Sequence, residues 1–223
     1  MIKAVLFDLD GTLVDTETIS ANAWRRSGDA LGYEVDDELI LSFVGRTADA
    51  VTDMLIERFG IECSAADEFF RMHQRIKGEL MDSELVTKPF AKKALAALKE
   101  RGFKLGLATS SYRPVAEREL EPFDMLAYFD AITCGNEVTH SKPDPEIYLL
   151  AAERLGMEPA ECAVVEDSPN GVRSGHAAGM AVFLVPDTIA PTPQISELCT
   201  DVLGSLDELL GAIKLYNDEH AAA

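Results

Sequence analysis

The stretch Asp8-Leu9-Asp10-Gly11-Thr12 is the first part of this sequence whose residue types and spacing could do chemistry. It follows Ala4–Phe7, an apolar run that is typical of a buried strand. At the end of a strand, two aspartates one residue apart point to the same side. Carboxylates held side by side repel each other unless a cation lies between them, and Mg²⁺ is a hard cation that oxygen ligands suit. We therefore predict a metal site here, although an acidic surface turn has the same local pattern.

Two later segments could bind phosphate. The apolar residues 104–108 end in Thr109-Ser110-Ser111, whose hydroxyl and backbone N–H groups suit a phosphate oxygen, or simply cap the helix that follows. Lys142 lies in a loop stiffened by Pro143 and Pro145, just before a helix. Its ammonium could neutralise an aspartate and a phosphate, or stay solvated like most surface lysines.

A fourth segment, Glu166-Asp167, ends the apolar run 162–165. Asp167 could complete the metal site with Glu166 beside it, or both acids could favour the N-terminus of the next helix. In an open sheet of parallel strands, ligands bind at the carboxyl ends of the strands. Because all four segments are at such ends, we interpret them as one shared site.

The elements that position these segments follow from the periodicity. Apolar strands alternate with amphipathic helices after residue 86, which predicts an α/β fold with a doubly wound, Rossmann-like parallel sheet. Four helices without an intervening strand follow the first strand, and they predict an inserted helical bundle. We expect a core of residues 1–15 and 86–223 and a helical cap of residues 16–85. The predicted strands are 4–7, 104–108, 131–134, 162–165 and 181–185. The predicted helices are 16–31, 36–43, 48–59, 65–80, 91–100, 113–120, 145–155, 169–178 and 206–213.

Composition restricts the classes of partner and compartment. The chain has 223 residues and a formal charge of −19, which disfavours nucleic acid and anionic membranes as partners. No apolar stretch approaches the roughly 20 residues that span a bilayer, and no signal peptide is evident, so we expect a cytoplasmic protein. The four cysteines are widely separated and form no C-x-x-C pair, which predicts reduced thiols. A monomer is the expected state.

The four motifs together resemble those of the haloacid dehalogenase-like hydrolase superfamily, in the helical-cap branch that contains β-phosphoglucomutase and many small phosphatases. The resemblance rests on the Asp8–Thr12 motif, on Thr109-Ser110, on Lys142 and on Glu166-Asp167, which occur in the order and spacing of the family. It covers nearly the whole chain. It implies an Mg²⁺-dependent phosphatase that acts on a small phosphorylated metabolite, a sugar phosphate or a related compound, through an aspartyl phosphate.

The resemblance also implies a role for each residue. Asp8 is similar to the nucleophile, and Asp10 to the general acid and base whose backbone carbonyl binds Mg²⁺. Thr109 and the backbone of Ser110 resemble the phosphate-binding groups, and Lys142 the charge-neutralising one. The residues that resemble the metal ligand and its supporting partner are Asp167 and Glu166.

Two alternatives remain open. A phosphosugar mutase of the β-phosphoglucomutase type uses the same aspartyl phosphate. However, the family's mutases usually have Val where this chain has Thr12, and a cap His and Arg where Ser20 and Ala48 stand, which favours hydrolysis. A non-enzymatic binding module on the same fold is the second alternative, and the presence of both Asp8 and Asp10 speaks against it.

The choice of substrate is expected to depend on the cap. Trp24, Arg46, Thr47 and Arg71 are the candidates to contact the substrate. The alternative is that Trp24 packs inside the helical bundle and that Arg71 lies on a solvated helix face.

Overall fold

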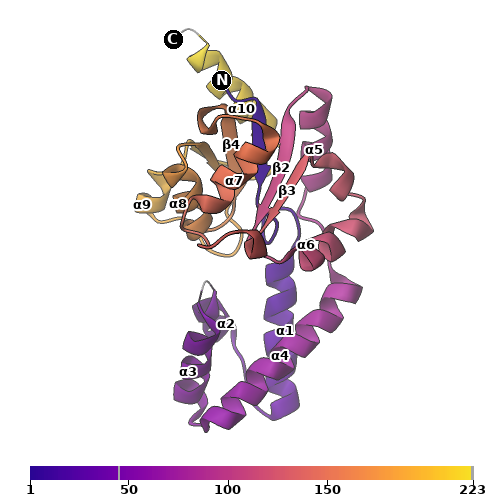
Figure 1. Ribbon diagram of the computed structural model, residues 1–223. Coiled ribbons are helices and arrows are strands. Elements are labelled where there is room, and N and C mark those ends of the chain that lie inside the picture. Colours follow the sequence, from indigo (N-terminus) through magenta and orange to yellow (C-terminus); the bar gives the residue numbers. More distant parts are fainter. Residues whose placement is uncertain (45, 222–223) are drawn as a thin grey trace. The chain divides into compact units, whose positions relative to one another are not determined.

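The computed structural model describes residues 1–44 and 46–221. The chain divides into two compact units, one of Met1–Asp15 with Val86–Ala223 and the other of Thr16–Leu85 (Figure 1). The first unit contains the sheet and six of the helices, and the second unit is helical.

The sheet has six parallel strands in the order β3-β2-β1-β4-β5-β6. This order confirms the predicted doubly wound, Rossmann-like architecture. The strands β1, β2 and β4 are buried along almost all of their length because neighbours cover both their edges and both their faces. The strands are β1 (Ala4–Phe7), β2 (Lys104–Thr109), β3 (Ala131–Cys134), β4 (Cys162–Glu166), β5 (Ala181–Leu184) and β6 (Asp201–Val202).

Strand β6 was not predicted. It has only two residues, and both are exposed, so it leaves no apolar pattern in the sequence. Its position is fixed by backbone pairing with β5 and by the hydrogen bond of 2.8 Å from the Leu203 N–H to the Leu184 carbonyl.

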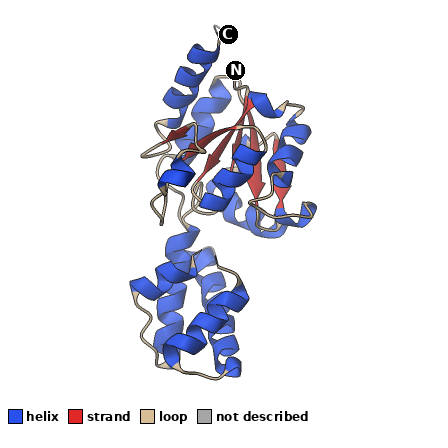
Figure 2. Cartoon of the chain, turned by 90° about the vertical axis from the view of Figure 1, so that its left-hand side faces the viewer, coloured by secondary structure: helices blue, strands red, loops and turns tan. Residues whose placement is uncertain are grey.

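Helices cover both faces of the sheet (Figure 2). Helices α7 and α8 contact each other and the strands from β1 to β5, whereas α5 packs against β2 and contacts α10. These helices are α5 (Ala91–Glu100), α6 (Arg113–Leu120), α7 (Glu146–Leu155), α8 (Pro169–Ala177), α9 (Pro193–Ser196) and α10 (Leu209–His220). Short 3₁₀ helices span Glu121–Phe123, Leu126–Tyr128, Gly135–Glu137 and Pro159–Glu161.

The prediction of a last helix over 206–213 is wrong at both ends. Helix α10 begins at Leu209, after a turn in which the Glu208 carboxylate accepts a hydrogen bond from the Gly204 N–H. It continues to His220 although its last residues are polar. Asn217 explains part of this length, because its side-chain amide forms two hydrogen bonds with the backbone of Ile2.

The second unit contains α1 (Thr16–Leu31), α2 (Asp37–Phe43), α3 (Ala48–Phe59) and α4 (Cys63–Glu84). Helix α1 packs along α4, and the aromatic rings between the helices form the interior of this unit. Helix α2 begins after Asp36, whose carboxylate accepts the Leu39 N–H, and α3 ends at Gly60 in the left-handed conformation. Within the described part of the chain, no helix combines the length and the apolar character needed to cross a bilayer.

The register of the central strands brings the candidate residues to one edge of the sheet. Phe7 of β1 pairs with Leu107 of β2 and with Val165 of β4, so the chain leaves all three strands at the same level. The strand order reverses between β1 and β4, which is where sheets of this kind bind their ligands. Asp8 and Glu166 therefore emerge at the point where a site is expected.

Candidate active site

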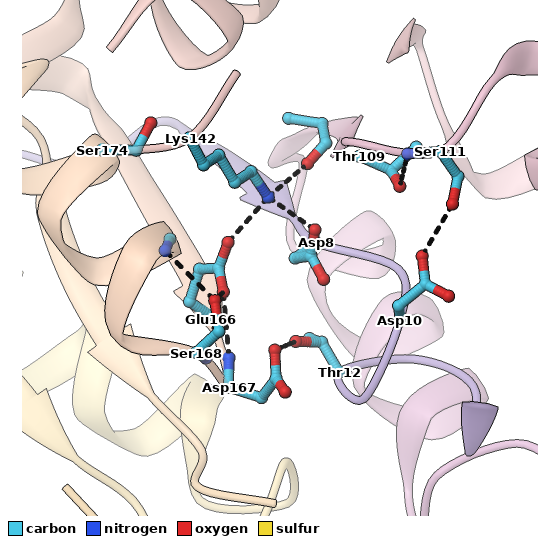
Figure 3. Close-up of polar contacts among 12 residues, drawn as sticks. Asp8, Asp10, Thr12, Thr109, Ser111, Lys142, Glu166, Asp167, Ser168 and Ser174 are labelled. Atoms are coloured by element: carbon cyan, nitrogen blue, oxygen red, sulfur yellow. Dashed lines mark hydrogen bonds and ion pairs between the residues drawn. The ribbon is translucent and has the colours of Figure 1, made fainter. Parts of the chain in front are cut away.

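The ammonium of Lys142 bonds to the other three predicted segments. It donates hydrogen bonds of 2.5 Å to Oδ1 of Asp8, 2.7 Å to Oε1 of Glu166 and 3.0 Å to the carbonyl of Ala108 (Figure 3). The Lys142 side chain is only 7% exposed. A lysine thus enclosed between two carboxylates is not a solvated loop residue.

The loop before α7 directs Lys142 inward. Ser174 of α8 donates a hydrogen bond of 2.7 Å to the carbonyl of Asp144, which ties this loop to the sheet unit. The Lys142 ammonium also lies 4.9 Å from the centre of the Tyr148 ring, one turn into α7. The loop, α7 and α8 therefore fix the position of the positive charge.

Glu166 is fully buried, and all its hydrogen bonds hold it in place. Oε1 accepts from Lys142 and from the Tyr148 hydroxyl, each at 2.7 Å. Oε2 accepts from the Ser168 hydroxyl at 2.9 Å and from the backbone N–H groups of Asp167 and Ser168, each at 3.2 Å. Helix α8 can approach Glu166 this closely because Gly171 has no side chain. A Cβ at this position would overlap the Glu166 carboxylate. Glu166 thus supports the positions of Lys142 and Asp167.

The carboxylates outnumber the positive charges here. Burial raises the pKa of Asp8 to about 7, although the Lys142 ammonium lowers it. Burial also raises the pKa of Asp167 well above its ordinary value, and the charges of Glu166 and Asp8 raise it further. Burial opposes ionisation of Glu166, but the charge and hydrogen bond of Lys142, together with Tyr148 and Ser168, lower its pKa. For Lys142, burial is outweighed by Asp8 and Glu166, which raise its pKa.

These residues fit a divalent cation. Carboxylate oxygens of Asp8, Glu166 and Asp167 lie within 4.8 Å of one another. Burial raises the pKa values of Asp8 and Asp167, and a cation with oxygen ligands would favour the ionised form of both carboxylates. Gly11 has a positive φ of 76°, and a Cβ there would overlap Oδ2 of Asp167, so the chain leaves room for that carboxylate. The Thr12 hydroxyl donates to Oδ1 of Asp167 at 3.4 Å.

Asp10 belongs to a second set of contacts beside the first. Its Oδ2 accepts a hydrogen bond of 2.9 Å from the Ser111 hydroxyl (Figure 3). The Ser111 N–H in turn donates to Oγ1 of Thr109 at 3.0 Å. Thr109 is buried and the Ser110 side chain is exposed. The loop after β2 thus contacts the loop after β1 through Ser111.

Two of the residues predicted to contact the substrate, Trp24 and Thr47, make contacts within the helical unit. Trp24 is 4% exposed, stacks on His73 at 3.8 Å and packs against Phe43, which agrees with the alternative that it packs inside the helical bundle. Thr47 caps α3 by accepting the Ala50 N–H.

The two arginine candidates are exposed. Arg71 donates a hydrogen bond to the Asp67 carbonyl one turn earlier in α4, and Arg46 lies in the segment before α3.

The sequence did not predict a role for Tyr148 or the pairing of Ser111 with Asp10. Tyr148 occurs among the apolar residues of α7, so its hydroxyl is hidden in a pattern that predicts only packing. Ser111 was part of the predicted hydroxyl cluster, but the sequence does not indicate which hydroxyl contacts Asp10. Ser168 is recognisable as a helix cap, since its side chain accepts the Gly171 N–H.

Comparisons with known proteins identify the family of the chain. Residues 5–185 match the model of a family described as haloacid dehalogenase-like hydrolase. The chain is 32% identical to the phosphorylated carbohydrates phosphatase of Thermotoga maritima over 96% of this chain and 99% of that protein. It is 31% identical to hexitol phosphatase B of Escherichia coli K12 over 93% and 94%.

A solved structure is also similar. The crystal structure of a putative beta-phosphoglucomutase from Thermotoga maritima has a TM-score of 0.82 and 31% identity, covering 96% of this chain and 99% of that one. The fold, the strand-end residues and the family match lead to one conclusion: the chain belongs to the haloacid dehalogenase-like hydrolases.

Proposed function

We propose that this protein is an Mg²⁺-dependent phosphatase that hydrolyses a small phosphorylated metabolite, a sugar phosphate or a related compound, through an aspartyl phosphate on Asp8. The observation that carries the proposal is the buried cluster in which Lys142 bonds to Asp8 and Glu166 beside Asp167. The names of two relatives, a phosphorylated carbohydrates phosphatase and a hexitol phosphatase, support the substrate class.

In the first step, a carboxylate oxygen of Asp8 bonds to phosphorus and the bond from phosphorus to the substrate's alcohol oxygen breaks. A carboxylate attacks a phosphate poorly because both are negative, and Lys142 reduces this repulsion. Asp10 donates a proton to the departing alcohol. Asp8, Asp167 and the Asp10 carbonyl would hold Mg²⁺, which when bound stabilises charge on the phosphoryl oxygens.

In the second step, Asp10 takes a proton from water and the water oxygen attacks phosphorus. Inorganic phosphate leaves, and the Asp8 carboxylate is restored. Thr109 and the Ser110 backbone hold the phosphoryl oxygens. We propose that residues 16–85 act as a cap that excludes water in the first step, with Arg46, Thr47 and Arg71 as its contacts to the substrate.

A phosphosugar mutase is the second candidate, because the chain is similar in structure to a putative beta-phosphoglucomutase. A mutase returns the phosphoryl group from Asp8 to another hydroxyl of the sugar. Hydrolysis is favoured by Ser20, which stands where the family's mutases have a histidine. Here the Ser20 hydroxyl lies 3.3 Å from Nε2 of His73, within the helical unit.

The test is the release of inorganic phosphate from a panel of sugar, polyol and short acid phosphates, with Mg²⁺ and with EDTA. An assay for isomerisation of β-glucose 1-phosphate runs beside it. We expect release that requires Mg²⁺ and is lost in Asp8→Asn, while Asp201→Asn at the exposed β6 keeps the full rate. Isomerisation without release would establish the mutase instead, and full activity of Asp8→Asn would disprove the role of Asp8.

A further inference from the structure

An ion pair in the sheet unit has no part in the chemistry described so far. The ammonium of Lys88 lies 2.5 Å from Oδ1 of Asp187, and their side chains are 19% and 17% exposed. Lys88 lies on the segment that returns from the helical unit, and its N–H donates to the Leu13 carbonyl. Asp187 lies in the loop after β5. The pair thus joins two loops at the carboxyl edge of the sheet.

The second oxygen of Asp187 lacks such a partner. Oδ2 is buried, and no hydrogen bond to it is found among residues 1–44 and 46–221. A buried carboxylate oxygen without a donor costs free energy, because it has lost its water and gained nothing in exchange. This oxygen is therefore in position to accept a hydrogen bond from a group outside the chain.

Gly11 shows where this oxygen points. A Cβ placed on Gly11 would overlap Oδ2 of Asp167 and would lie 3.4 Å from Oδ2 of Asp187. The two carboxylates therefore approach the same glycine, and Oδ2 of Asp187 and Oδ2 of Asp167 both lie near the same point of the chain. Asp167 and the positive φ of 76° require a glycine at this turn, whereas Asp187 lies at an ordinary contact distance from the same point.

We propose that Asp187 is a positioning residue of the metal site, whose Oδ2 accepts a hydrogen bond from water in the coordination shell of the cation that Asp167 binds, while Lys88 holds Oδ1. Mg²⁺ retains several of its waters in protein sites, and those waters need acceptors for their protons. Outer carboxylates of this kind typically change metal affinity by 10-fold to 100-fold. The inference rests on the proposed function, because it requires the cation.

The experiment measures Mg²⁺ binding without substrate, by isothermal titration of the full chain after dialysis against EDTA. We expect Asp187→Asn to weaken Mg²⁺ binding by about 10-fold. Lys88→Met breaks the same ion pair but keeps the carboxylate, so it should retain more of the affinity than Asp187→Asn. Glu161→Gln is the matched control, since the Lys3–Glu161 pair has the same 2.5 Å distance but lies before β4, away from the carboxyl edge.

The thermal midpoint of each variant, in EDTA and in Mg²⁺, separates metal binding from stability, because the rise caused by Mg²⁺ is measured within one variant. A smaller rise for Asp187→Asn than for Lys88→Met supports the inference. Equal losses in both variants, or unchanged affinity in Asp187→Asn, would overturn it and leave the pair as a clamp between loops. If the unaltered protein itself bound no Mg²⁺, the metal of the proposed function would be wrong as well.

Discussion

Lys142 and Glu166 form an ion pair of 2.7 Å in which both side chains are almost completely withheld from solvent, with exposures of 7% and 0%. Because Asp8 contacts the same ammonium, one positive charge lies between two buried carboxylates. Removal of one partner of a buried ion pair leaves an uncompensated charge, and this is far more costly than the loss of a surface pair.

We therefore expect Lys142→Met to lower the free energy of unfolding by about 3–5 kcal/mol, measured by urea titration in EDTA. Phosphate release should also be lost. Lys3→Met removes the same side chain from an ion pair whose lysine is 60% exposed, and its cost should stay below about 1 kcal/mol. Equal costs in the two variants would contradict the account of a buried charge balance.

Ser111 provides a test of how Asp10 is oriented. Loss of its hydroxyl in Ser111→Ala removes the hydrogen bond to Oδ2 of Asp10. A hydrogen bond to a charged group is worth about 1.5–3 kcal/mol, so we expect kcat for phosphate release to fall by about 10-fold or more. Ser111→Thr keeps a hydroxyl and should recover part of the rate. Ser83→Ala, at an exposed hydroxyl that donates to the Glu79 carbonyl in α4, should leave kcat unchanged, and a loss as large as that of Ser111→Ala would refute the specific role of Ser111.

Gly171 tests how closely α8 must approach Glu166. A Cβ in Gly171→Ala would overlap the Glu166 carboxylate, so the helix or the carboxylate must move, and we expect a loss of about 1–3 kcal/mol in the free energy of unfolding. Gly78→Ala in α4 is the matched control, because its Cβ meets no atom within 4 Å. There the better helix propensity of alanine should stabilise the protein by up to about 1 kcal/mol. The two changes in urea midpoint should have opposite signs.

His73 gives a pH dependence in the helical unit. Burial, together with the charge of Lys77, lowers the pKa of His73 to about 4, and its Nδ1 has no hydrogen-bond partner in the described structure. The unfolded chain binds a proton near pH 6.5, so between pH 6.5 and 4 the unfolded state carries more protons. Stability is therefore complete above pH 6.5 and decreases as the pH falls toward 4, by about 1.4 kcal/mol per pH unit at most.

The measurement is urea unfolding at several pH values, followed by the fluorescence of Trp24, the only tryptophan, which stacks on His73. His73→Phe keeps a ring against Trp24 but cannot be protonated. Its stability should depend less on pH between 6.5 and 4 than that of the unaltered protein. Parallel curves for the two proteins would show that His73 does not cause the acid sensitivity.

The core of the site was predictable from sequence because parallel strands place their ends together. Once residues 104–108 and 162–165 are recognised as strands beside the first, Thr109 and Glu166 must lie near Asp8, whatever the loops do. The contacts of Lys88 with Asp187 depend on loop conformations, which leave no periodic pattern. The interior position of Trp24 depends on how four helices pack, and its place on α1 was compatible with either face.

The chain passes between the two units twice, after Asp15 and before Val86, and these two segments pair with each other within the sheet unit. The Asp15 N–H donates to the Val86 carbonyl at 2.9 Å, and Val14 forms an antiparallel bridge with Thr87. The helical segment therefore leaves and re-enters at neighbouring points, as an insertion in a hairpin would. An insert anchored in this way can change in length and sequence without altering the strands that carry Asp8 and Asp167. Such a chain can exchange its helical unit in evolution and keep its strand-end residues.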